Sequence, residues 1–424
     1  KGEIIKISPF LTDFYYTCVI QKKQERICIK MKKVKVLLAG IGGYGKLITN
    51  EILNNYDKLG VELCAVADPF PDGNDRLEEI KALGAKVYSD MEEFFRAGSV
   101  DLTVISTPIQ FHTKHIITAL EHGSNVLCEK PLCADEKDIE KLIAARDKSG
   151  KFVYIGYQWS FSKAIEDLKT DISAGVFGKP LSLKTLVVWP RNADYFSRGT
   201  GWAGKISLPS GELVYDSIAN NAAAHYLHNM FYVLGSKVNE ALAPKDFKAT
   251  LLRANNIENF DTADIICKFD GGFEARFTAT HTTKETLNPC FDYAFEKGRV
   301  LFCNAEKPLD DASGSLEYVK RDIVAYFSDG SVKHYGDPYE NERRKFYIAL
   351  DAVRGLENGY ERCGIETAAV HTRFINELQR STEIKNVKKS LVKTEDKMTY
   401  VDGLFGAVTD IYKTGNGSLS DFAE

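Results

Sequence analysis

The chain has 424 residues, enough for two domains that each bury a core. A hydrophobic fraction of 44% and a net charge of -4 are ordinary for a globular protein, so the composition points to neither nucleic acid nor a membrane surface as a partner. The nine cysteines are scattered without a C-x-x-C pair, which argues against a metal site and predicts reduced thiols in the cytoplasm.

Residues 34–45 predict a buried strand that runs directly into a phosphate-binding turn. Gly40, Gly42 and Gly45 have the G-x-G-x-x-G spacing, and an apolar helix is predicted over residues 46–53. The first glycine permits the tight turn, the second lets a pyrophosphate approach the backbone, and the third lets the helix pack close to its strand. An ordinary tight strand-to-helix connection is the alternative. The same cofactor site includes the intervening Ile41, Gly43 and Tyr44.

A second predicted strand, residues 61–67, ends at Asp68. A carboxylate there can accept hydrogen bonds from both hydroxyls of an adenosine ribose, and it would repel a 2′-phosphate. The order of strand, glycines, helix, strand and terminal acid therefore predicts a dinucleotide site. NAD is favoured over NADP, although Arg76 follows closely enough to weaken the charge argument.

Strands and helices continue to alternate, with further strands predicted over residues 86–88, 101–106, 125–128 and 152–155. These strands lack a polar face, which predicts a doubly wound, parallel Rossmann sheet covered by helices on both sides. Ligands bind at the carboxyl ends of such strands. Two strand ends therefore supply further candidate cofactor contacts, which are Ser106, Thr107, Pro108 and His112 after one strand and Glu129 and Lys130 after the next.

Three motifs resemble one known family, the NAD(P)-dependent oxidoreductases of the glucose-fructose oxidoreductase, inositol dehydrogenase and MocA type. They are A-G-I-G-G-Y-G at 39–45, S-T-P-I-Q-F-H at 106–112 and V-L-C-E-K-P-L at 126–132. In that family the lysine of Glu-Lys-Pro lies beside the nicotinamide and contacts the substrate hydroxyl, so the resemblance implies this role for Lys130. Burial would also lower the pKa of a lysine at this strand end toward a useful range, while a solvated lysine is the alternative.

The resemblance also implies the second domain, an α/β unit with a large, mostly antiparallel open sheet. In the family this sheet covers the active site with one face and often mediates oligomerisation with the other, which implies a homodimer or homotetramer. The matching strand patterns lie at 181–189, 265–269 and 273–281. We therefore divide the chain into an N-terminal extension without an assigned role (1–30), the Rossmann domain (31–155), a substrate and oligomerisation domain (156–382) and a tail with a docking helix (383–424).

The second domain departs from the family at the position of the usual base. A long helical pattern follows Asp216 and ends near residue 235, and family members have aspartate and histidine four residues apart on one face of this helix. This chain has Asn220 at the histidine position, and asparagine takes no proton at neutral pH. Three hypotheses about the catalytic base stay open. Asn220 orients the substrate while Lys130 handles the proton, or His225 or His228 replaces the base, or the reaction differs or has been lost.

A segment rich in aromatic residues and arginine precedes this helix. Aromatic faces and guanidinium groups suit a sugar or polyol, and the arginines suit a carboxylate or phosphate on it. Packing of the loop and surface ion pairs are the alternatives. The candidate substrate contacts are Tyr157 and Trp159 where the two domains meet, Arg191, Tyr195, Arg198 and Trp202 in the loop, and Asn221 in the helix.

The sequence thus predicts an oxidoreductase that moves hydride between NAD and a hydroxyl-bearing carbon of a sugar, polyol or related acid. Lys130, Asp216, Asn220 and His225 are its candidate catalytic residues. No acidic residue lies at a spacing that would complete a metal site with the histidines. An NAD-dependent glycoside hydrolase that oxidises its substrate transiently and a catalytically inactive NAD-binding protein are the alternatives.

Overall fold

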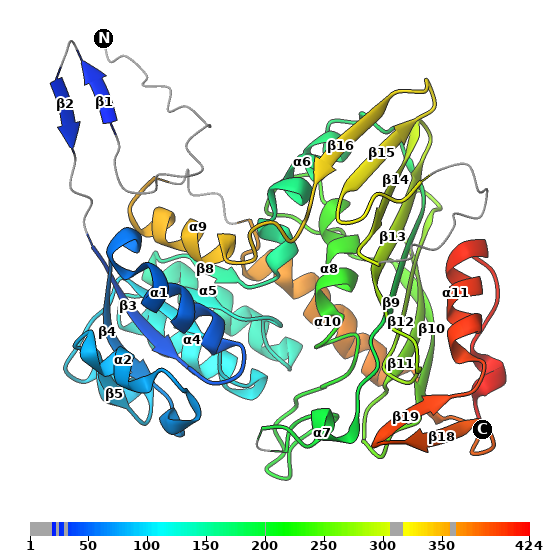
Figure 1. Ribbon diagram of the computed structural model, residues 1–424, viewed down its shortest axis with the longest axis horizontal. Coiled ribbons are helices and arrows are strands. Elements are labelled where there is room, and N and C mark those ends of the chain that lie inside the picture. Colours follow the sequence, from blue (N-terminus) through cyan, green and yellow to red (C-terminus); the bar gives the residue numbers. More distant parts are fainter. Residues whose placement is uncertain (1–18, 23–24, 29–32, 200, 306–316, 357–361) are drawn as a thin grey trace.

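The computed structural model describes residues 19–22, 25–28, 33–199, 201–305, 317–356 and 362–424 (Figure 1). Two sheets organise the chain: a six-stranded parallel sheet in the N-terminal half and a nine-stranded, mostly antiparallel sheet in the C-terminal half. The predicted α/β class with these two kinds of sheet is confirmed. Of the N-terminal extension, the structure describes the backbone of one hairpin, β1 (Val19–Lys22) and β2 (Glu25–Cys28), and the remainder lies outside the described residues.

The parallel sheet has the strand order β5-β4-β3-β6-β7-β8. The chain therefore runs outward from β3 to β5 and then crosses back to place β6 on the other side of β3. This reversal opens a crevice at the carboxyl ends of β3 and β6, which is where doubly wound folds bind ligands. The strands are β3 (Val34–Ala39), β4 (Val61–Ala67), β5 (Lys86–Tyr88), β6 (Leu102–Ile105), β7 (Asn125–Cys128) and β8 (Val153–Ile155).

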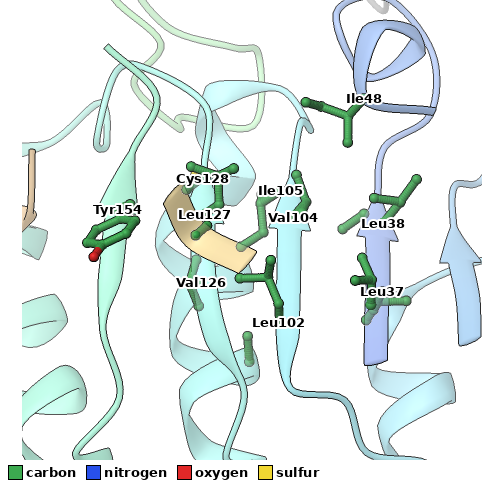
Figure 2. Close-up of a cluster of buried hydrophobic side chains, with 14 of the residues drawn as sticks. Leu37, Leu38, Ile48, Leu102, Val104, Ile105, Val126, Leu127, Cys128 and Tyr154 are labelled. Carbon is green, nitrogen blue, oxygen red and sulfur yellow. The ribbon is translucent and has the colours of Figure 1, made fainter. Parts of the chain in front are cut away.

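The core of this sheet is buried on both faces, as its apolar strands predict. Figure 2 shows side chains of neighbouring strands packed side by side, among them Leu37, Val104 and Leu127. The covering helices are α1 (Gly45–Leu59), α2 (Leu77–Ala82), α3 (Met91–Phe95), α4 (His112–Glu121) and α5 (Ile139–Ser149). Two late helices, α9 (Arg344–Val353) and α10 (Ile365–Ser381), complete the same core with Phe346, Ile348 and Ala368.

The nine-stranded sheet has the order β16-β15-β14-β13-β9-β12-β11-β10-β17. Its pairs are antiparallel except β9 with β12 and β10 with β17. The strands are β9 (Pro180–Val188), β10 (Asp246–Arg253), β11 (Thr262–Lys268), β12 (Glu274–Thr280), β13 (Leu287–Phe295), β14 (Gly298–Cys303), β15 (Ile323–Phe327), β16 (Val332–Gly336) and β17 (Ile384–Asn386).

Helices cover both faces of this sheet. Figure 1 shows α8 (Ala224–Val233) and α10 on the face toward the parallel sheet, together with α6 (Lys163–Ser173), and α11 (Leu404–Thr414) on the far face. Between β17 and α11 the chain forms a second hairpin, β18 (Val392–Glu395) and β19 (Met398–Val401). None of the helices in the described segments has the length and apolar character needed to cross a membrane.

The predicted long helix after Asp216 is wrong at its beginning, because α8 starts only at Ala224 and residues 218–223 form turns. Side chains compete here with helical hydrogen bonds. The Asn220 amide donates to the Tyr215 carbonyl at 3.1 Å, and the Ser217 hydroxyl accepts from the Asn220 N–H at 3.2 Å. Asp216 and Asn220 consequently do not share a helical face.

The expectation of reduced thiols is wrong for one pair. Cys290 in β13 lies directly opposite Cys303 in β14, and the two form a disulfide. Strand register decides this pairing, and the spacing of the cysteines in the chain does not reveal it. The cysteines outside this disulfide, among the described residues, are Cys64, Cys128, Cys133, Cys267 and Cys363.

The far face of the large sheet is closed by the end of the chain. Helix α11 buries Leu404 and Val408 against Leu186 and Val188 of β9. Just beyond the helix, Arg276 donates to the carbonyl oxygens of Gly415 and Gly417, at 2.8 Å each, while it pairs with Asp264 at 2.7 Å. A buried ion pair thus fixes the position of the tail.

We expect Leu404→Ala to lower the free energy of unfolding by about 2–5 kcal/mol, because the truncated side chain leaves a cavity under α11. Asp410→Ala on the exposed side of the same helix is the matched control and should change it by less than about 0.5 kcal/mol. Urea unfolding of both variants measures the difference. Equal losses in the two would mean that α11 does not contribute to the folded core.

Candidate functional site

The glycine-rich turn has the shape that a dinucleotide requires. A Cβ on Gly40, whose φ is +82°, would lie 2.9 Å from the backbone of Ser106, and one on Gly45 would lie 2.2 Å from the Gly40 oxygen. Both positions therefore need glycine for close approach. The space over Gly42 is open, with no atom within 4 Å of where a Cβ would be. The residues present thus leave room for a pyrophosphate against the backbone.

Asp68 lies at the end of β4 with its orientation fixed by the backbone. One carboxylate oxygen accepts from the Ile41 N–H at 2.9 Å and the other from the Phe70 N–H at 2.8 Å. The side chain of Asn74 donates to the Ile41 carbonyl at 2.8 Å, so the turn is held from two sides. Sequence analysis missed Asn74, which lies in a polar loop without a motif.

The side-chain contacts of Arg76 are with residues other than Asp68. Its guanidinium donates to both carboxylate oxygens of Glu79, at 2.8 and 2.7 Å, and to the Asn54 side chain at 2.8 Å. The positive charge is thus compensated by Glu79 and held against α1. Arg76 therefore weakens the charge argument for NAD over NADP less than its place in the sequence suggests.

The loop after β6 is tied to the loop after β7 by His112. One ring nitrogen lies 2.7 Å from the Pro131 carbonyl oxygen and the other 2.9 Å from the Thr107 carbonyl oxygen. Burial lowers the pKa of His112, although both hydrogen bonds oppose this shift. The His112 imidazole thus contacts two backbone carbonyl oxygens, and these contacts hold the two loops in place. Ser106 and Pro108 contribute backbone to the same crevice, where the Ser106 N–H donates to the Ala39 carbonyl at 2.7 Å.

Glu129 is engaged in a buried ion pair. Its partner is Lys345 of α9 at 2.5 Å, a lysine with only 1% of its side chain exposed. Lys345 also donates to the Gly156 carbonyl at 3.2 Å and lies 4.6 Å from the centre of the Tyr44 ring. Burial lowers the pKa of Lys345, but Glu129 and Tyr44 more than offset it, so the pKa is raised and the amine stays charged.

Sequence analysis missed Lys345, although a lysine among the apolar positions of a helix was a signal. The position of Gly156 supports its importance, because a Cβ there would lie 2.9 Å from the Lys345 nitrogen and 3.1 Å from both Glu129 oxygens. A side chain at position 156 would therefore have to displace the charged ends of Lys345 and Glu129.

Lys130 follows directly and begins a chain of hydrogen bonds into the second sheet domain. Its ammonium donates to the backbone oxygen of Asn221 at 2.7 Å and to the side-chain oxygen at 3.0 Å. The Asn221 amide donates to Asp216 at 2.7 Å, and Asp216 accepts from the Gly204 N–H at 2.6 Å. Asn221, predicted to bind substrate, is thus the partner of Lys130. Asn220, predicted to be catalytic, is turned toward Tyr215.

Burial lowers the pKa of Lys130 to about 8 and raises the pKa of Asp216. An ammonium has three N–H donors, and Asn221 occupies two of them. Lys130 therefore keeps one donor for a ligand, and its pKa lies closer to the neutral range than that of an ordinary lysine.

His225 lines a cavity of about 400 Å³ between the two sheets, a size in the range of small-molecule sites. Its Nδ1 is buried without a partner among the described residues, and burial together with Lys130 holds its pKa well below the usual range. A neutral imidazole thus faces the cavity. The other lining residues are Tyr44, Gln158, Trp159, Trp189, Tyr226, Asn304, Arg321, Tyr339 and Glu342.

The remaining candidates divide between core and cavity. Tyr157 is buried and stacks on His228 at 3.8 Å, and His228 lies 3.1 Å from the Ser160 hydroxyl, so both belong to the packed core. Trp159 forms part of the cavity wall. Arg191, Tyr195, Arg198 and Trp202 form one stacked cluster beside it. Within the described segments no three His, Cys, Asp or Glu side chains are gathered as metal ligands.

Comparison with known proteins gives one family match. Residues 34–157 match the family described as "Oxidoreductase family, NAD-binding Rossmann fold". The chain is 32% identical over 149 residues to inositol 2-dehydrogenase 4 of Saccharopolyspora erythraea, covering 34% of this chain and 43% of that protein. It is 29% identical over 151 residues to 2,7-anhydro-N-acetylneuraminate hydratase of Mediterraneibacter gnavus, covering 36% of this chain and 38% of that protein. These alignments span less than half the length of the curated relatives.

The fold likeness extends further than the sequence likeness. The WlbA dehydrogenase of Bordetella pertussis, solved in complex with NADH and UDP-GlcNAcA, superimposes with a TM-score of 0.64. The match covers 82% of this chain and 96% of that one at 20% identity. At this identity the likeness shows the fold of both domains and nothing further.

We expect Lys345→Met to lower the free energy of unfolding by about 3–5 kcal/mol, because it leaves the Glu129 carboxylate buried without a counter-charge. The double variant Glu129→Gln with Lys345→Met should recover part of this loss. A double-mutant cycle in urea measures the coupling. Additive losses would show that the two side chains do not act as a pair.

The pKa of Lys130 makes stability depend on pH in a defined window. The folded pKa of about 8 lies below the unfolded value of about 10.4, so between these values the unfolded chain holds a proton that the folded chain does not. The free energy of unfolding should therefore rise with pH, relative to that of Lys130→Met, from about pH 8 to about pH 10.4. A constant difference between the two proteins across this window would contradict the lowered pKa.

Proposed function

We propose that the protein is an NAD-dependent oxidoreductase acting on a hydroxyl-bearing carbon of a carbohydrate, because residues 34–157 match the oxidoreductase family with an NAD-binding Rossmann fold. The observation that carries the proposal is the hydrogen-bonded chain from Lys130 through Asn221 to Asp216, at the strand end beside the glycine-rich turn and the cavity. Inositol 2-dehydrogenase and the anhydro-sugar hydratase among the relatives support a sugar, polyol or related acid as substrate.

The cofactor we propose is NAD rather than NADP. The open space over Gly42 and the first turn of α1 would receive the pyrophosphate, and Asp68 would accept hydrogen bonds from the ribose hydroxyls. The ion pair with Glu79 makes the Arg76 guanidinium less available to a 2′-phosphate. When bound, NAD supplies the hydride acceptor for alcohol oxidation.

In this proposal Lys130 binds the substrate hydroxyl through its third N–H and, once deprotonated, accepts the hydroxyl proton. A pKa of about 8 gives a useful fraction of neutral amine near neutral pH. Asn221 and Asp216 hold the amine in place. His225, which lines the cavity and whose Nδ1 has no partner among the described residues, is the second candidate base. In this proposal Asn220 has no catalytic role, because its side-chain amide donates to the Tyr215 carbonyl.

The alternatives are less well supported. No relative reported above is named a glycoside hydrolase, and an intact lysine, asparagine and aspartate chain is what a working site would keep. We also propose a cytoplasmic location, which the five described cysteines outside a disulfide support and the Cys290–Cys303 disulfide does not. A homodimer or homotetramer completes the proposal, and any interface on the far face of the large sheet would include α11.

The first experiment measures cofactor binding. We expect NAD and NADH, but not NADP or NADPH, to raise the melting temperature, because a ligand that binds only the folded state stabilises it. Asp68→Ser should reduce this discrimination.

NADH formation is then followed with a panel of polyols, sugars and sugar acids. Lys130→Met should bind NADH normally and lose roughly 10²–10⁴-fold in turnover. A protein that none of the four nucleotides stabilises would refute the proposal.

A further inference from the structure

Two arginines converge on one aromatic ring in the loop after β9. The guanidinium carbon of Arg198 lies 3.5 Å from the centre of the Tyr195 ring, and that of Arg191 lies 4.9 Å from it. Arg198 also packs on Trp202 at 4.8 Å and Arg191 on Trp189 at 5.6 Å. Both positive charges are therefore held close together on aromatic faces, which leave the N–H edges of a guanidinium free to bind.

Neither arginine has a carboxylate partner in the part of the chain that the structure describes. Arg198 donates to the Tyr195 carbonyl, and Arg191 contacts the Pro190 carbonyl at 3.4 Å. The Nε of Arg191 is buried and has no hydrogen-bond partner among the residues that the structure describes. By contrast, Arg321, which lines the cavity, pairs with Asp337 at 2.6 Å. The two loop arginines thus carry positive charge that no described side chain neutralises by contact.

This charge lies beside the proposed reaction centre. The charge of Arg198 acts on both Lys130 and Asp216, and Trp189 under Arg191 lines the cavity. Asp216 does not neutralise the arginines by contact, because its oxygens bind the Gly204 N–H and the Asn221 amide. The two guanidinium groups repel each other at close range, and water screens this repulsion poorly at a partly buried site. An anion between the two guanidinium groups removes this repulsion.

We propose that the substrate is an anionic carbohydrate, whose carboxylate or phosphate binds Arg191 and Arg198 while its reacting hydroxyl lies at Lys130. This inference rests on the proposed function and narrows its substrate class. Guanidinium groups match both anions, since they present two parallel N–H donors to two oxygens. A neutral polyol leaves the buried Nε of Arg191 unpaired and is the poorer ligand.

The chain offers a local reporter, because its three tryptophans, Trp159, Trp189 and Trp202, all lie at this site. Tryptophan fluorescence of the protein, with and without NAD, is titrated with D-glucuronate, D-glucose 6-phosphate and D-glucose. We expect one of the charged sugars to bind roughly 10- to 100-fold more tightly than glucose, as a charge-assisted hydrogen bond predicts. The ratio between glucuronate and the phosphate distinguishes the two anions.

Variants locate the effect. Arg191→Gln and Arg198→Gln should each abolish most of the preference for the charged sugar, while Arg373→Gln should keep it, since that arginine is exposed on α10 and pairs with Glu140. Stabilisation by NADH, unchanged in all three variants, shows that they fold and keep the cofactor site. If NADH fails to stabilise the wild type, the proposed function fails, and the titrations without NAD still test the arginine pair.

Three results would overturn the inference: equal affinity for charged and neutral sugars, a preference that survives in both glutamine variants, or no response to either charged sugar up to its solubility limit. Each would mean that the arginines serve only to pack the loop on its aromatic side chains.

Discussion

The buried ion pair between Glu129 and Lys345 is the constraint on which the site depends, because it joins the loop after β7 to a helix that follows more than two hundred residues later. Removing two charges from water costs several kcal/mol each, and only close contact compensates that cost. Helix α9 must therefore dock on the parallel sheet for the loop at residues 129–131 to hold its shape. Tyr44 packs on the same lysine and links the glycine-rich turn to this arrangement.

The site that results is divided between the two domains. Lys130 comes from the parallel sheet, whereas Asn221 and Asp216 precede α8 over the large sheet. Asn221 of the second domain thus orients the Lys130 side chain. The first domain sets the shape of the loop that carries this lysine. Its lowered pKa has the same origin, because burial depends on both surfaces being in contact. The protonation of Lys130 therefore depends on the contact between the two domains.

Local patterns were sufficient to predict much of the first domain. The bounds of β4, β5 and β7 agree with the predicted strands, since apolar runs and glycine breakers act over a few residues. Features set by long-range contact could not be predicted. The partner of Lys130 is Asn221 because side-chain hydrogen bonds around Tyr215 delay the start of α8. The Cys290–Cys303 disulfide depends on strand register, and the role of Lys345 depends on which sheet its helix packs against.

The return of α9 and α10 to the first sheet has a consequence for protein engineering. Phe346, Ile348 and Ala368 occupy the same core as the strands drawn in Figure 2, so a fragment that stops after β8 exposes the apolar surface that these side chains cover. The unit built on the parallel sheet is therefore discontinuous along the chain. A chimera that exchanges this unit with a relative must transplant α9 and the first turns of α10 as a second insert, or it joins two incompatible halves of one core.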